Sequence, residues 1–185
     1  MSVFTVANQL TLLRMLLIPL FVILVVYGQL GWALVVFGTA GLTDGLDGLI
    51  ARRTGQRSSL GAWLDPMADK LLLVSAFIVL TVPGLDLANP LPLWLTVLVI
   101  SRDVVIVLTV AIVNLAIGRR TFRPSMLGKV ATAIYIMTAV VAMFFNFQGY
   151  HSVVVDLFVY ASLAVTLASG LHYIRHAARI IETST

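Results

Sequence analysis

The chain has 185 residues, of which 60% are hydrophobic and only 11% are charged, and its mean hydropathy is +1.04. A soluble globular domain has roughly 45–50% apolar and about 25% charged residues, so this composition excludes a typical water-soluble protein. The chain contains no cysteine, which excludes a disulfide-stapled fold, a thiol nucleophile and a cysteine-ligated zinc site. The sequence therefore predicts an integral membrane protein.

The formal net charge of +4 would suggest nucleic-acid binding in a soluble protein. Here the lysines and arginines fall mostly in the connections between long apolar runs, which is typical of membrane-protein loops that stay in the cytoplasm. Because no separate basic face is present, we expect no nucleic-acid partner.

Long apolar runs predict membrane-spanning helices, because about 18 or more consecutive apolar residues are long enough to cross a bilayer. Glycine and proline mark nearly every break between these runs. The six predicted spans are 10–27, 31–51, 60–82, 91–117, 126–147 and 152–181. No long-period repeat divides the chain, so we expect residues 1–185 to form a single transmembrane domain.

The basic residues also predict how the spans are oriented. They collect in the second and fourth connections and at the end of the last span, whereas the first, third and fifth connections contain no lysine or arginine. The positive-inside rule then places both termini in the cytoplasm. We therefore expect an all-α, six-transmembrane-helix bundle in the plasma (inner) membrane, with a site between helices near the cytoplasmic face.

Four of the eight acidic residues lie between positions 44 and 69, in the second and third predicted spans. Asp44 and Asp47 are three positions apart, and Asp65 and Asp69 are four apart, so each pair shares one helix face. A carboxylate in a membrane costs roughly 2.5–3.5 kcal/mol on insertion scales, and clustered carboxylates repel one another unless a cation or protons neutralise them. Since a short connection makes the two helices antiparallel neighbours, we expect both pairs to converge on one polar cavity.

Four carboxylates without histidine or cysteine indicate a hard divalent cation such as Mg²⁺, Mn²⁺ or Ca²⁺ rather than zinc. Two such ions roughly 3.5–4 Å apart would neutralise the cluster and stabilise both sides of a phosphoryl transfer. The neighbouring residues suit a phosphate ligand. Gly48 and Gly61 allow close approach and Ala51 keeps the face small, while Arg52 offers a forked set of donors and Ser58 a hydroxyl.

Two motifs, Asp44-x-x-Asp47-Gly48-x-x-Ala51-Arg52 and Gly61-x-x-x-Asp65-x-x-x-Asp69, together resemble the complete signature of the CDP-alcohol phosphotransferases. The opening Asn8-Gln9-Leu10-Thr11-x-x-Arg14 and the stretch Ser101-Arg102-Asp103 resemble the phosphatidylglycerophosphate and cardiolipin synthase branch of that family. The resemblance covers nearly the whole chain. It implies a six-helix bundle, usually a homodimer, that takes CDP-diacylglycerol as donor and releases CMP.

The resemblance also implies roles for individual residues. Asp44, Asp47, Asp65 and Asp69 would hold two Mg²⁺ or Mn²⁺ ions on the donor diphosphate, and Asp69 would also be the general base for the acceptor hydroxyl. The residues matched to the nucleotide pocket or its cap are Asn8, Thr11, Gly48, Ala51, Arg52, Ser58 and Gly61.

A second unusual charge is Arg102, which falls in the middle of the fourth span, where an unpaired guanidinium is costly. A structural pair with Asp103 is one explanation, but adjacent residues point to different helix faces, so we expect Arg102 instead to bind an anionic group of the acceptor. Three further residues could complete this anion pocket, although setting the topology is an alternative role for the two in the fourth connection. They are Lys129, Arg119 and Arg123.

An anion pocket favours a phosphate-bearing acceptor over serine or choline. Glycerol 3-phosphate would give phosphatidylglycerol phosphate, and phosphatidylglycerol would give cardiolipin. Phosphatidylglycerophosphate synthases commonly show a second arginine about two turns after the Ser-Arg pair, where this chain has Leu108, Thr109 and Val110. That difference favours a cardiolipin synthase, whereas the short chain favours glycerol 3-phosphate, which we take as the expected acceptor.

A cation transporter or channel is the main alternative of another class, because acids inside a membrane can also mark ion pathways. Transporters often carry matching broken helices in two halves of the chain. Here the acidic pairs occur in one helical hairpin and have no counterpart in the second half, which favours the enzyme.

Overall fold

The computed structural model describes residues 6–54, 59–117 and 126–182. Within these ranges, some side chains lie outside the description. They are those of residues 6–8, 44–54, 59–66, 110–117, 174 and 176–182.

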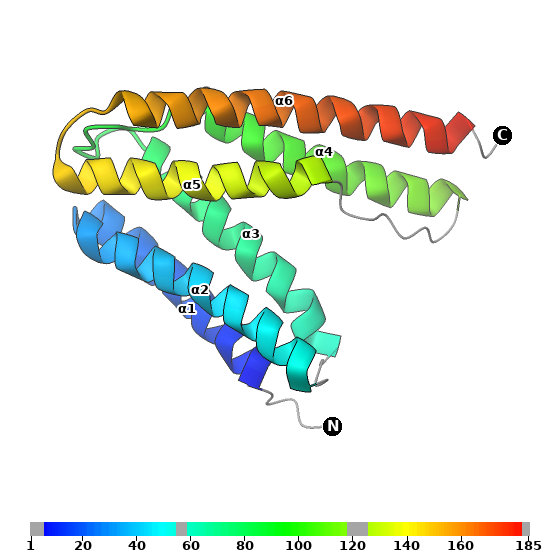
Figure 1. The fold of residues 1–185 in the computed structure, drawn as a ribbon, viewed down its shortest axis with the longest axis horizontal. Helices are drawn as coiled ribbons and strands as arrows, with labels where there is room; N and C mark the ends of the chain where they lie inside the picture. The colour runs from blue at the N-terminus through cyan, green and yellow to red at the C-terminus, as the bar shows by residue number, and fades with distance from the viewer. Residues whose placement is uncertain (1–5, 55–58, 118–125, 183–185) are drawn as a thin grey trace. The chain divides into compact units, whose positions relative to one another are not determined.

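Six helices make up the regular structure of the described ranges, as the apolar runs predict (Figure 1). They are α1 (Val6–Val26), α2 (Leu30–Thr54), α3 (Ser59–Thr81), α4 (Leu93–Ile117), α5 (Met126–Gln148) and α6 (Val153–Glu182). An all-helical fold is thus confirmed for this part of the chain.

Among the described residues, three helices are long and apolar enough to cross a membrane. The qualifying segments are Gln9–Val26 in α1, Met126–Gln148 in α5 and Val153–Tyr173 in α6. The apolar part of α2 is shorter and covers Leu30–Thr43. Six complete spans and cytoplasmic termini stay predictions.

Two compact units make up the fold. The first contains Met1–Pro90 and Ala139–His151, and the second contains Leu91–Thr138 and Ser152–Thr185. The first unit therefore holds α1, α2, α3 and the C-terminal half of α5, whereas the second holds α4, the N-terminal half of α5, and α6. A single domain over the whole chain stays a prediction.

The first unit is built around α1, which packs against both α2 and α3 (Figure 1). Phe21 of α1 and Phe37 of α2 are buried, and their ring centroids lie 5.5 Å apart. Ala33 and Ala40 of α2 are also fully buried, and such small side chains let helices approach closely. Close packing of small and aromatic residues therefore holds this helical hairpin together.

Gly28 makes the tight turn between α1 and α2 at the predicted break. Its φ of 71° lies in the left-handed region, which glycine adopts without steric cost. The N–H of Gly28 donates to the carbonyl of Val25 at 3.0 Å, which satisfies a carbonyl left open at the end of α1. The turn lets α2 fold back antiparallel to α1.

Two buried asparagines join the α3–α4 connection to the end of α5 within the first unit. The backbone N–H of Asn89 donates to Oδ1 of Asn146 at 2.6 Å, and Nδ2 of Asn146 donates to the carbonyl of Asn89 at 3.1 Å. In addition, Nδ2 of Asn89 donates to the carbonyl of Tyr150 at 2.9 Å. These bonds satisfy backbone groups at the buried Asn89, which lies outside the helices.

In the second unit, α4 packs against α6, and hydroxyl pairs join α5 to α6. The hydroxyls of Tyr135 and Thr166 lie 2.7 Å apart, and those of Thr138 and Ser162 lie 2.8 Å apart. All four residues are buried. Such bonds between helices are a usual means of association where apolar burial alone gives little preference.

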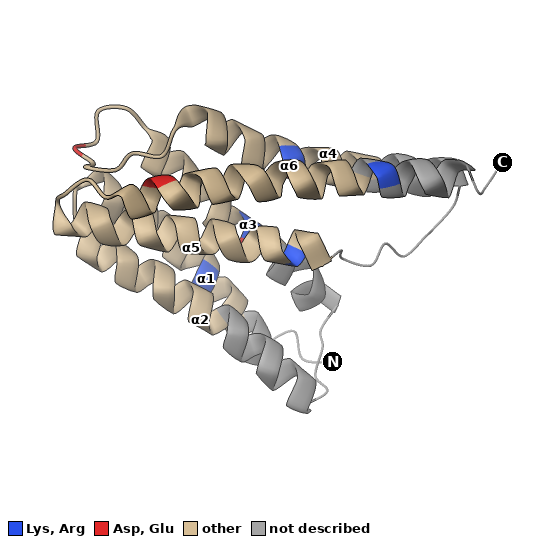
Figure 2. Cartoon of the chain, turned by 45° about the horizontal axis from the view of Figure 1, so that its top comes forward, with Lys and Arg blue, Asp and Glu red and all other residues tan. Residues whose placement is uncertain are grey.

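The described helices bury polar residues and expose apolar ones. Leu16, Leu42 and Leu157 are each about two-thirds exposed or more, whereas Thr11 and Ser162 are fully buried. Charged residues occupy few positions along the helices (Figure 2). A surface of this kind suits a lipid environment, in agreement with the predicted membrane protein.

Replacing Asn146 tests the asparagine pairing. Asn146→Ala removes both bonds to Asn89 and leaves a buried backbone N–H without its acceptor, so we expect a loss of about 1–3 kcal/mol in unfolding free energy. This should lower the melting temperature in detergent by about 2–4 °C per kcal/mol. Gln148→Ala, at an exposed position near the end of the same helix, is the control. Equal melting temperatures for the two variants would contradict the structural role of Asn146.

Candidate active site

The four acidic residues lie on α2 and α3, as their spacing predicts. Asp44 and Asp47 belong to α2, and Asp65 and Asp69 belong to α3, with helical backbone at all four positions. These two helices pack in the same unit. Of the four side chains, that of Asp69 is described, and those of the other three lie outside the description.

Asp69 forms an ion pair with Arg14 of α1. Nη1 of Arg14 lies 2.5 Å from Oδ1 of Asp69. The Arg14 side chain is 0% exposed, whereas the Asp69 side chain is 44% exposed. A buried arginine thus holds the carboxylate of a partly exposed side chain.

Arg14 is a residue to which no role was assigned from the sequence. It occurs within the opening motif, but the signal that singled out Arg102 was equally present here. Arg14 is a guanidinium within an apolar segment long enough to cross a membrane, where a charge without a partner is costly. That cost indicates a buried partner, although it does not identify which carboxylate supplies it.

Thr11 lies three positions before Arg14 and therefore on the same face of α1. Thr11 and Arg14 are both fully buried, so the face of α1 that carries them packs inside the first unit. The predicted part of Thr11 in capping a nucleotide pocket stays a prediction.

Most of the other predicted site residues lie outside the described side chains. For Asn8, Gly48, Ala51, Arg52 and Gly61 the structure gives a helical backbone and nothing of the residue's surroundings. Ser58, Arg119 and Arg123 fall outside the described residues. The nucleotide-binding roles and the loop arginines' roles stay predictions.

The donor set fits a hard divalent cation. Carboxylate oxygens are the ligands that Mg²⁺ and Mn²⁺ prefer, and both helices that carry them belong to one packed unit. The Asp69 side chain is 44% exposed while Arg14 is bonded to it. Within the described side chains no three histidines or acids come together, but this leaves out three of the four aspartates.

Arg102 pairs with its neighbour in sequence. Nη1 of Arg102 lies 2.7 Å from Oδ1 of Asp103, and Nε donates to Oγ of Ser169 on α6 at 3.2 Å. The expectation that Arg102 and Asp103 do not pair was therefore wrong. Adjacent Cβ atoms do point to different helix faces, but the long arginine side chain can bend back to its neighbour. Its proposed contact with an acceptor stays a prediction.

The remaining described candidate for the acceptor is Lys129, which is exposed in the first turn of α5. Lys129 and Arg102 belong to the second unit, whereas the acidic residues belong to the first. Convergence of acids and acceptor residues on one cavity stays a prediction.

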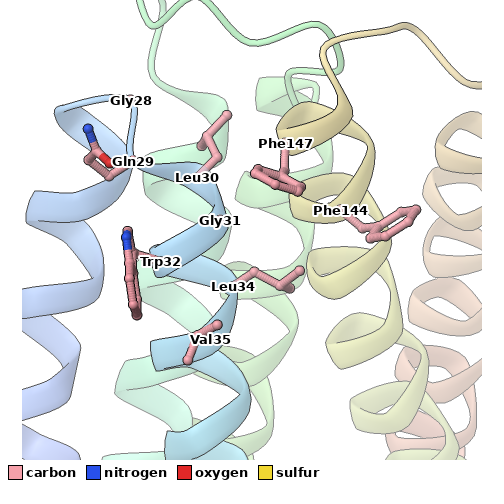
Figure 3. A pocket seen from close by; sticks show the side chains of 9 residues that line it. All are labelled: Gly28, Gln29, Leu30, Gly31, Trp32, Leu34, Val35, Phe144 and Phe147. Carbon is pink, nitrogen blue, oxygen red and sulfur yellow. The ribbon is translucent and has the colours of Figure 1, made fainter.

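A cavity of about 560 Å³ lies in the first unit, beside the α1–α2 turn (Figure 3). Its side chains come from the turn, from the start of α2 and from the end of α5, and apart from Gln29 they are apolar. Gly31 leaves room there for the ring of Phe147, since a Cβ at this position would lie 2.8 Å from Cε2 of that ring. None of the predicted site residues lines this cavity, so it is distinct from the candidate active site.

Residues 4–169 match the CDP-alcohol phosphatidyltransferase family, and the match includes the four acids, Arg14 and Arg102. The chain belongs to this family. It is thus a membrane enzyme of phospholipid biosynthesis, from a family that uses a divalent metal. Membership decides against the transporter alternative.

The chain is similar to relatives that are named for two different activities. It is 35% identical to a probable phosphatidylglycerophosphate synthase of Mycobacterium tuberculosis, over 95% of this chain and 82% of that protein. It is 30% identical to the CDP-diacylglycerol–glycerol-3-phosphate 3-phosphatidyltransferase of Bacillus subtilis, over 98% and 99% of the two chains. It is 38% identical to a CMP-forming cardiolipin synthase of Streptomyces coelicolor, over 70% of this chain and 60% of that protein.

Replacing Asp103 tests the local neutralisation of Arg102. Asp103→Ala leaves a guanidinium that is only 11% exposed without its carboxylate, so we expect a loss of about 1.5–3 kcal/mol, the range for hydrogen bonds to charged groups. The melting temperature of the purified protein in detergent measures this loss. Asp86→Ala, at an exposed position in the α3–α4 connection, removes the same charge as a control. If Asp103→Ala melted at the same temperature as Asp86→Ala, the pair would not contribute to stability as proposed.

Proposed function

We propose that this enzyme transfers the phosphatidyl group of CDP-diacylglycerol to glycerol 3-phosphate and releases CMP. The observation that carries the proposal is the family match over residues 4–169, which includes the four acids on α2 and α3. Two relatives named for phosphatidylglycerophosphate synthesis or for glycerol 3-phosphate match at least 95% of this chain and 82% of their own length.

Cardiolipin synthesis from phosphatidylglycerol is the second candidate. The identity of 38% to a cardiolipin synthase favours it, and so does the apolar stretch at Leu108 where a second arginine commonly follows in glycerophosphate enzymes. That similarity covers less of both chains than the similarity to the Bacillus subtilis enzyme, which supports glycerol 3-phosphate as the acceptor.

Asp69 is the residue that accepts the acceptor's proton in this proposal. The acceptor hydroxyl oxygen forms a new bond to the phosphorus that carries diacylglycerol, and the bond from that phosphorus to the CMP oxygen breaks. The hydroxyl proton goes to the carboxylate of Asp69 and then to water, while CMP leaves with the electron pair. A positioned base of this kind contributes about 10²–10⁴-fold to the rate.

The donor diphosphate would be bound through metal ions. In this proposal Asp44, Asp47, Asp65 and Asp69 would hold two Mg²⁺ or Mn²⁺ ions. Bound there, the ions would stabilise negative charge on the phosphoryl oxygens and on the departing CMP. The nucleotide is held by the predicted pocket residues, which are Asn8, Thr11, Gly48, Ala51, Arg52, Ser58 and Gly61.

The phosphate of glycerol 3-phosphate is bound by basic residues of the second half of the chain. Arg102 supports this role because two of its five N–H donors bond to Asp103 and Ser169 among the described residues, and a guanidinium can bind a further oxyanion through the others. Lys129, Arg119 and Arg123 complete the predicted pocket.

The proposed enzyme is a homodimer in the inner membrane, a single six-span domain with its site facing the cytoplasm.

An acceptor assay tests the proposed function directly. Purified protein with CDP-diacylglycerol and Mg²⁺ is offered either glycerol 3-phosphate or phosphatidylglycerol, and CMP release is followed. We expect CMP with glycerol 3-phosphate, none after EDTA, and recovery when Mg²⁺ or Mn²⁺ is added back. Release with phosphatidylglycerol alone would overturn the acceptor, and release with neither acceptor would overturn the proposed function.

Replacing the base tests the chemistry. Asp69→Asn keeps an oxygen that can accept from Arg14 but removes the basic carboxylate, so we expect a folded protein whose rate of CMP release falls at least about 10²-fold. The melting temperature in detergent reports folding. Turnover close to that of the unaltered protein would remove Asp69 as the proposed base.

A further inference from the structure

Arg14 is a charged side chain with no exposed surface, set in an apolar helix. Its segment of α1 is long and apolar enough to cross a membrane. A buried guanidinium is costly unless it is paired and hydrogen-bonded, and here it is paired with Asp69 of α3, 55 positions away in sequence. The pair therefore joins α1 to the helix that carries the proposed base.

The two partners of this ion pair differ in exposure. Arg14 is wholly buried, while 44% of the Asp69 side chain is accessible. The buried arginine thus holds an acidic side chain that is itself partly at the surface of the described part of the chain.

The ion pair is formed by a group whose chemistry suits a metal ligand. Nη1 of Arg14 donates to Oδ1 of Asp69, and the oxygens of an ionised carboxylate can accept hydrogen bonds and bind hard cations. A carboxylate that binds a metal is typically held by a hydrogen-bond donor behind it, and loss of such a donor commonly costs about 10–100-fold in metal affinity. Arg14 has the position and the chemistry of such a donor.

We propose that Arg14 is the positioning residue for Asp69: it orients the carboxylate toward the divalent cation and the acceptor hydroxyl. This inference rests on the proposed function of Asp69. α1 is suited to the task because it packs against both acid-bearing helices, α2 and α3 (Figure 1). Thr11, buried on the same face one turn earlier, shows that this face of α1 is turned into the unit.

A double-mutant cycle tests whether Arg14 acts through Asp69. Mn²⁺ binding to the full-length protein in detergent is measured by the electron paramagnetic resonance signal of free Mn²⁺, without substrate. Arg14→Met should raise the Kd for Mn²⁺ about 10–100-fold. In the Asp69→Asn background the same change should have little further effect, since the carboxylate that Arg14 orients is already gone.

Two further variants separate orientation from charge. Arg14→Lys keeps the positive charge but not the planar fork, so its Kd should lie between those of the unaltered protein and Arg14→Met. Arg175→Met removes a positive charge from an exposed position on α6 and should leave the Kd unchanged. Arg14→Met should also lower kcat for CMP release while the KM for CDP-diacylglycerol stays nearly constant.

The inference is overturned if Arg14→Met binds Mn²⁺ as tightly as the unaltered protein, or if its effect is equally large in the Asp69→Asn background. If Arg14→Met does not fold, Arg14→Lys and Arg14→Gln replace it in the same cycle, with melting temperatures as the check. The binding cycle needs no turnover. Failure of CMP release by the unaltered protein would therefore count against the proposed function, and failure of the cycle would count against Arg14.

Discussion

Burial of charge is the constraint on which this structure depends. The described helices expose leucines and bury threonines, serines and asparagines, so a buried charged side chain must find its partner inside the protein. Arg14 meets this requirement through Asp69, which ties α1 to α3. α1 also packs against α2. The Arg14–Asp69 pair thus lies in the same unit as all four acidic residues.

The sequence alone was sufficient to place the six helices, because long apolar runs and their breaks are strong local signals. Gly28 shows why a break is easily located, since its positive φ is a conformation that glycine adopts freely. Helix ends were less certain: the sixth was predicted from Ser152, whereas α6 begins at Val153. Ser152 instead caps the helix, with its Oγ accepting from the N–H of Val154 at 3.3 Å.

The site could be predicted only where its signal lies within one helix. Spacings of three and four residues identified the acid pairs, and the helical backbone at these positions agrees with them. The bond from Arg14 to Asp69 joins distant parts of the chain, and no local pattern specifies such a partner. The pair of Arg102 and Asp103 is local, and it was wrongly predicted not to form. The rule that adjacent residues point to different helix faces was applied to an arginine side chain long enough to bend back to its neighbour.

The two arginines within apolar helices are neutralised in different ways, and this difference bears on their roles. The carboxylate partner of Arg14 comes from another helix, so this ion pair joins α1 to α3, which also pack against each other. The carboxylate partner of Arg102 is the next residue of its own helix, and among the described side chains its bond to α6 goes to the neutral hydroxyl of Ser169. In the proposed function, Arg102 would thus bind an oxyanion without breaking a carboxylate bond between helices. A fixed arginine suits the positioning of a catalytic group, whereas a locally neutralised one suits the binding and release of an anion.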